Sequence, residues 1–125
     1  MTSQSANVGG GEFPFLAHET PRPGQIDMIH ECREALRNGG YHLAAAPTGI
    51  GKTAASLAAA IEISRASTSK LHILFLTGRQ SQHRIVIETA RGINSRLDQT
   101  YDNVKVVDLI GRDSMCEVID LQTTK

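Results

Sequence analysis

The 125-residue chain lacks tryptophan, and aromatic residues make up only 4% of it, so any hydrophobic core must consist mainly of aliphatic side chains. It has two cysteines, Cys32 and Cys116, which are too few for a disulfide scaffold. We therefore expect a reducing compartment, the cytoplasm, or the nucleus if the source is a eukaryote. The longest apolar run, residues 71–76, contains His72 and is far shorter than the roughly 20 residues of a membrane span.

An excess of charge of either sign is also missing, because 13 basic residues balance 13 acidic ones. Nucleic-acid or membrane binding is therefore not expected as a property of the whole surface, although a local site remains open. The hydrophobic share of 40% and the charged share of 21% are ordinary for a globular protein, and the length suits one small domain.

The apolar pattern alternates between two periods along the chain. A spacing of three to four residues predicts helices over residues 25–38, 53–65 and 81–97. Short apolar runs predict buried strands over residues 41–46, 71–77 and 104–109. The alternation predicts an α/β fold, a parallel sheet flanked by helices, preceded by a flexible N-terminal lead over residues 1–20.

A glycine-rich turn between the first strand and the second helix has the pattern of a nucleotide phosphate loop. Its residues are Ala46, Pro47, Thr48, Gly49, Ile50, Gly51, Lys52 and Thr53. In such a loop, backbone N–H groups surround phosphate oxygens, the lysine contacts the β and γ phosphates, and the threonine hydroxyl binds Mg²⁺. The pattern predicts binding of ATP or GTP with Mg²⁺. The alternative is an ordinary strand-to-helix turn.

The residues of this loop and of the segment before it resemble the motifs of a particular class of enzyme. Ala-Pro-Thr-Gly-x-Gly-Lys-Thr resembles motif I of superfamily 2 helicases, which implies a RecA-like domain. Arg22 and Gln25 are similar to the Arg-x-x-Gln element that precedes motif I in the XPD/DinG branch. There the glutamine reads the adenine edge, so the resemblance implies that Gln25 selects ATP over GTP. The alternative is a solvated residue in the first helical turn.

Two further segments extend this resemblance. Residues 77–82 are similar to motif Ia, which contacts single-stranded DNA, and the resemblance implies DNA contacts by Thr77, Arg79, Ser81 and Gln82. The alternative is that Ser81 caps the third helix. The stretch Gly-Arg-x-x-x-Cys ending at Cys116 resembles the start of an iron–sulfur domain, which implies that Cys116 ligates a 4Fe-4S cluster in the longer protein.

An Asp-Glu-x-His motif is missing from the sequence, and Asp108 after Val107 is only a weak substitute. Without that motif and a second motor domain, hydrolysis should be slowed by several orders of magnitude. We therefore expect an N-terminal fragment of an ATP-dependent DNA helicase that is inactive alone, with a partial RecA-like domain over residues 21–116 and a truncated insertion over residues 117–125. Two alternatives remain: another P-loop ATPase or kinase, and a non-catalytic nucleotide-binding module.

Overall fold

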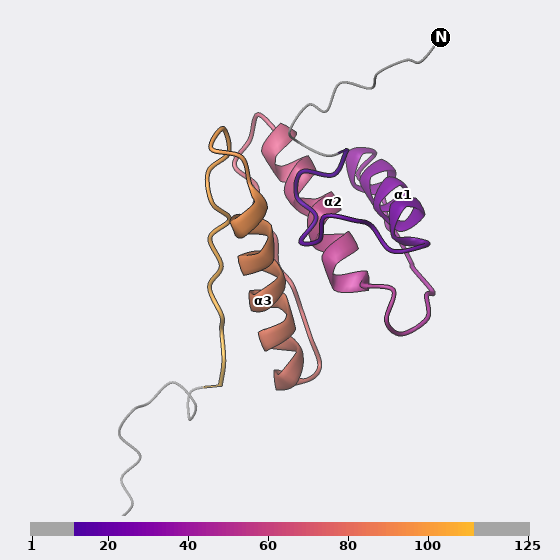
Figure 1. The fold of residues 1–125 in the computed structure, drawn as a ribbon, viewed down its shortest axis with the longest axis vertical. Coiled ribbons are helices and arrows are strands. Elements are labelled where there is room, and N and C mark those ends of the chain that lie inside the picture. The colour runs from indigo at the N-terminus through magenta and orange to yellow at the C-terminus, as the bar shows by residue number, and fades with distance from the viewer. Residues whose placement is uncertain (1–11, 112–125) are drawn as a thin grey trace, which may run out of the picture.

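The computed structural model describes residues 12–111, and every structural statement below concerns that range. Its elements are α1 (Gln25–Arg37), α2 (Lys52–Ala66) and α3 (Gln80–Arg96) (Figure 1). Their ends lie within one residue of the predicted ends, so the three predicted helices are confirmed. After α1, Gly39 adopts a positive φ of 69°, and the Gly40 N–H donates to Ala35 O at 2.8 Å, which satisfies a carbonyl at the helix end.

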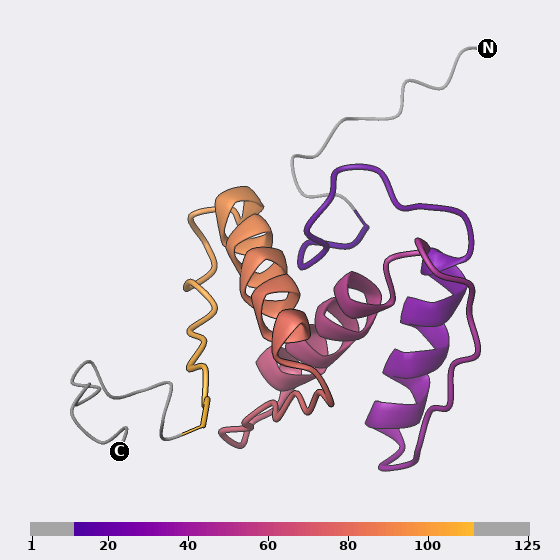
Figure 2. The ribbon, with the colours of Figure 1, turned by 90° about the horizontal axis from the view of Figure 1, so that it is seen from below.

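Helix α2 lies between the other two and packs against both (Figures 1 and 2). It is apolar over much of its circumference, as expected of a central helix. Most of its buried side chains are small, which allows neighbouring backbones to approach closely. They are Ala54, Ala55, Leu57, Ala58, Ala59 and Ile61.

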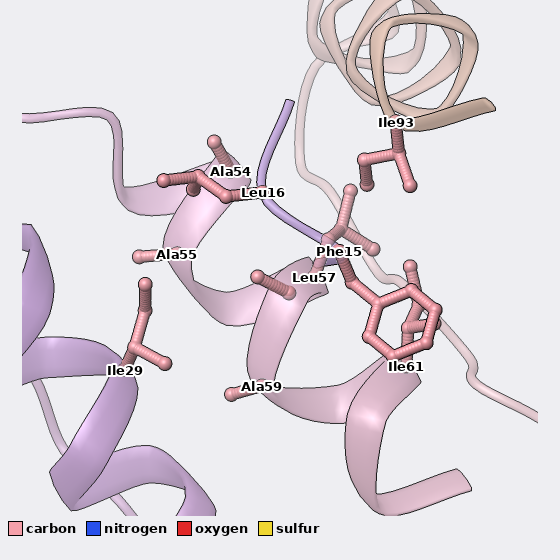
Figure 3. Packing of buried hydrophobic residues seen from close by; sticks show 10 residues of the cluster. Phe15, Leu16, Ile29, Ala54, Ala55, Leu57, Ala59, Ile61 and Ile93 are labelled. Atoms are coloured by element: carbon pink, nitrogen blue, oxygen red, sulfur yellow. The ribbon is translucent and has the colours of Figure 1, made fainter. Parts of the chain in front are cut away.

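The core forms around this helix (Figure 3). Ile29 of α1 and Ile93 of α3 are both fully buried against it. Phe15 and Leu16 precede α1 in the sequence, yet they are also buried in the core. Phe15 makes an edge-to-face contact with Tyr101, with ring centroids 5.2 Å apart. Part of the segment expected as an N-terminal lead therefore contributes to the core, which is largely aliphatic, as the composition predicted.

The prediction of an α/β fold with a parallel sheet is wrong. Within residues 12–111 the structure contains helices and irregular segments, and no strand. The segments 41–46, 71–77 and 104–109 form no backbone–backbone hydrogen bonds with one another. Segment 41–46 lies near α1, whereas segment 104–109 lies beside α3 on the opposite side of the molecule (Figures 1 and 2).

The physical reason for this error is that a short apolar run indicates burial, whereas a strand also requires a neighbouring strand for its backbone groups. Here helices separate the first of these segments from the last, so those two cannot pair with each other. Several of their side chains are exposed as a result: Leu43 is 98% exposed, Leu76 80% and Val107 81%. The molecule is thus a three-helix arrangement with extended connections.

Candidate nucleotide-binding site

The predicted phosphate loop leads directly into the first turn of α2. Gly49 and Gly51 have φ values of 89° and 84°, a left-handed conformation that glycine adopts without steric cost. Gly51 is the N-cap of α2, and no side chain caps the first N–H groups of the helix. The N-terminus of a helix attracts anions through these N–H groups and through the helix dipole. The local geometry therefore fits a phosphate group.

Lys52 provides a cation at the same place. Its Nζ atom donates to Ala46 O and to Pro47 O, both at 2.9 Å, so the side chain folds back over the loop. These carbonyls are neutral acceptors, whereas a phosphate oxygen is charged and forms a stronger hydrogen bond with an ammonium group. Thr53 follows in the first turn of α2, where its hydroxyl is the side-chain oxygen that could bind a Mg²⁺ ion. The residues that are present thus fit a magnesium–nucleotide complex.

The turn before α1 contacts this loop directly. The Arg22 guanidinium donates to Gly49 O at 2.6 Å, and Gln25 Nε2 donates to Gly51 O at 3.1 Å. At the other end of the amide, Gln25 Oε1 accepts the Arg22 backbone N–H at 3.0 Å. The structure thus places Arg22 and Gln25 beside the loop, and nothing in the sequence indicated that their partners would be loop carbonyls.

The candidate DNA-binding residues gather at the start of α3. Arg79 is its N-cap, and Arg79, Ser81 and Gln82 are all exposed. The Thr77 hydroxyl donates to Arg79 O at 3.2 Å, which links the end of the extended segment to the helix start. Ser81 lies within the first turn, and no side chain caps α3, so the capping alternative for Ser81 is wrong.

A histidine–aspartate pair that sequence reasoning missed joins α3 to the extended segment 104–109. His83 Nδ1 and Asp108 Oδ1 are 2.6 Å apart, and the two side chains are 27% and 34% exposed. Asp108 was the weak candidate for the acidic motif, and its carboxylate is instead engaged by α3. The two residues are 25 positions apart, and no local pattern in the sequence links them.

Among the described residues, two side chains outside the loop, Arg84 and Cys32, have shifted pKa values. Arg84 Nε donates to Glu88 Oε1 at 2.7 Å in an exposed ion pair on α3, and this hydrogen bond raises the pKa of Arg84. Cys32 packs against the core, and burial raises the pKa of its thiol. Within the described residues, no cluster of side chains could hold a metal ion on its own. Cys116 and the insertion over residues 117–125 lie outside that range.

One cavity of the described part is distant from the loop. Its volume is about 1120 Å³, and it lies between α2, α3 and the extended segments 71–77 and 104–109, with largely apolar side chains around it. A smaller cavity of about 360 Å³ adjoins the loop and is lined by Asp27 and Glu31 of α1. Carboxylates repel phosphate groups, so the smaller cavity does not suit a phosphate.

The sequence profile of the family "Type III restriction enzyme, res subunit" (ResIII) matches residues 18–115, which is most of the chain. The chain belongs to this family. At the family level, ResIII is a helicase-like, ATP-binding module of the superfamily 2 hydrolases, which act on nucleic acid. The resemblance to superfamily 2 is therefore confirmed at this level.

Comparison with curated proteins and with solved structures gave no significant match. No helix within residues 12–111 of this ResIII protein is both long enough and apolar enough to cross a membrane.

Proposed function

We propose that this ResIII protein binds Mg²⁺–ATP at the loop formed by residues 46–53, as the nucleotide-binding part of a DNA helicase. The observation that supports the proposal most strongly is the position of Lys52, which follows two left-handed glycines at the uncapped N-terminus of α2. The backbone N–H groups of this turn would surround the phosphates, while Lys52 would exchange its carbonyl partners for the β and γ oxygens. The Thr53 hydroxyl would hold the metal ion.

The test is calorimetric titration of the 125-residue chain with Mg²⁺–ATP. We expect Lys52→Ala to abolish binding, because Lys52 is the only basic residue within the loop and the first turn of α2. Lys70→Ala is the matched control, since Lys70 is an exposed lysine beyond the other end of α2. Equal affinities in Lys52→Ala and in the unmodified chain would reject the loop as the phosphate site.

We further propose that the protein is of the XPD/DinG type within superfamily 2, on the order of its motifs, and that it moves on single-stranded DNA. Its DNA contacts would be Thr77, Arg79, Ser81 and Gln82. Arg79, Ser81 and Gln82 are exposed together at the start of α3, where hydroxyl, amide and guanidinium groups are typical phosphate partners.

For this second proposal, the measurement is binding of a fluorescent single-stranded oligonucleotide. Arg79→Ala should weaken binding and reduce its salt dependence by about one counterion, because one phosphate contact is lost. Arg96→Ala, at the other end of α3, is the control and should leave both quantities unchanged. If the two variants behave alike, the start of α3 is not the DNA-binding surface.

One observation favours a second candidate function, a nucleotide-binding module without hydrolysis. Asp108, the weak candidate for the acidic motif, is bonded to His83, and the next residue is a leucine rather than a glutamate. Phosphoryl transfer to water needs carboxylates that hold the metal ion and orient the water. An assay of phosphate release with and without single-stranded DNA separates the two functions, because robust DNA-stimulated release by this chain would exclude the module.

A further inference from the structure

The turn before α1 and the phosphate loop are joined at three points. Arg22 donates to the carbonyl of Gly49, and Gln25 donates to the carbonyl of Gly51. The third point is steric, because a Cβ atom on Gly24 would lie 2.7 Å from Ile50 Cδ1. We call Arg22 and Gln25, which donate these two hydrogen bonds to loop carbonyls, the loop clamp.

Gln25 is fully buried, and it is the only buried polar side chain among the described residues. Both ends of its amide are engaged, one by Arg22 N–H and the other by Gly51 O. The amide retains one hydrogen and one lone pair, but with no exposed surface they cannot reach a base in this conformation. Its position therefore suits a structural contact better than a contact with the nucleobase.

The carbonyls held by the clamp determine where the neighbouring N–H groups point. In a trans peptide the C=O and the following N–H lie in one plane and point in opposite directions. The described chain has no cis peptide bond, so fixing Gly49 O also fixes the Ile50 N–H, and fixing Gly51 O fixes the Lys52 N–H. Gly51 O also accepts the Ala55 N–H at 3.0 Å, so the first turn of α2 and the clamp hold the same atom.

We propose that Arg22 and Gln25 are positioning residues, which orient the Ile50 and Lys52 N–H groups toward the phosphates whatever base the nucleotide carries. This inference rests on the proposed function of the loop. Two left-handed glycines have more conformational freedom than other residues, and an ordered loop must lose that freedom before or during binding. The clamp restricts the loop before the ligand arrives, which increases affinity through preorganisation.

The experiment compares Mg²⁺ complexes of ATP, GTP and inorganic tripolyphosphate, which has no base, by calorimetry on the 125-residue chain. Arg22→Ala and Gln25→Ala should each weaken the affinity for all three ligands by the same factor, roughly tenfold if one hydrogen bond is lost. Arg37→Ala and Gln99→Ala are the controls, because both residues are exposed and neither contacts the loop. They should bind all three ligands as the unmodified chain does.

The outcomes separate the competing explanations. If Gln25→Ala weakens ATP binding alone, Gln25 reads the adenine edge and the positioning role is rejected. If both folded clamp variants bind every ligand normally, the proposal is also rejected. If the unmodified chain binds neither ATP nor tripolyphosphate while retaining its helical circular dichroism, then the proposed function itself has failed.

Folding is controlled separately, because Gln25 is buried and its replacement leaves Arg22 N–H without a partner. Arg22 is exposed, so Arg22→Ala should retain the circular dichroism spectrum and the thermal midpoint. If Gln25→Ala fails to fold, Arg22→Ala decides the question alone. A direct readout is amide NMR of the ligand-free protein, in which Arg22→Ala should lower the backbone order of Gly49 and Ile50 and leave that of Gly78 unchanged.

Discussion

The phosphate loop and the extended segments 71–77 and 104–109 are both irregular backbone, yet they are constrained very differently. In the loop, side chains of Arg22, Gln25 and Lys52 bind four carbonyls, and the chain then enters a buried helix. The extended segments have few such contacts, and their apolar side chains are widely exposed. The comparison shows that polar side chains hold the loop by hydrogen bonds to its carbonyls, whereas an apolar run alone does not form a strand.

The largest expected difference is in stability, between the helical core behind the loop and the extended segments, and two aliphatic substitutions measure it. Ile29→Ala should lower the free energy of unfolding by about 2–5 kcal/mol, because Ile29 is fully buried between α1 and α2 and its loss leaves a cavity. Leu74→Ala should change it by less than about 0.5 kcal/mol, because Leu74 is 76% exposed. Urea denaturation followed by circular dichroism gives both values. Equal effects would show that segment 71–77 is packed in solution.

A smaller effect is expected where one extended segment does have a polar anchor. Asn94 Nδ2 donates to Val104 O at 2.9 Å, and the Val104 N–H donates to Asn94 Oδ1 at 2.7 Å, so the side chain pairs with that residue's backbone as a strand would. Asn94→Ala should cost about 1–2 kcal/mol and speed hydrogen exchange at Val104.

Gln99→Ala is the control for this substitution, because Gln99 is an exposed amide a few residues away. Unchanged exchange at Val104 in Asn94→Ala would mean that other contacts hold the segment. In that case, the contrast between the loop and the extended segments would be weaker than the hydrogen bonds suggest.

Much of the structure that depends on local sequence could be predicted. The three helices follow from apolar spacing, and the double glycine after α1 and the glycines before α2 mark where helices end and begin. The residue pattern at 46–53 indicated superfamily 2, and family membership agrees with that superfamily, whereas phosphate binding by the loop stays a prediction.

What could not be predicted depends on partners distant in the sequence. The apolar runs were wrongly predicted to form strands, because pairing between strands is not encoded within any one of them. Likewise, the sequence singled out Gln25 without revealing Gly51 O as its acceptor, and nothing near His83 indicated Asp108. The assignment to a branch of superfamily 2 depended on short motifs, which the match to the broader ResIII family leaves as a proposal.

The central position of α2 has a consequence for the whole molecule. Its first turn begins at the loop, and its remaining turns form the middle of the core. Binding at one end of this helix is therefore thermodynamically linked to folding, because a ligand that requires the intact first turn binds only the folded chain. A nucleotide present at 100 times its dissociation constant would stabilise the fold by about 2.7 kcal/mol. The nucleotide would then act on the protein as a folding ligand, and the melting temperature would report its occupancy.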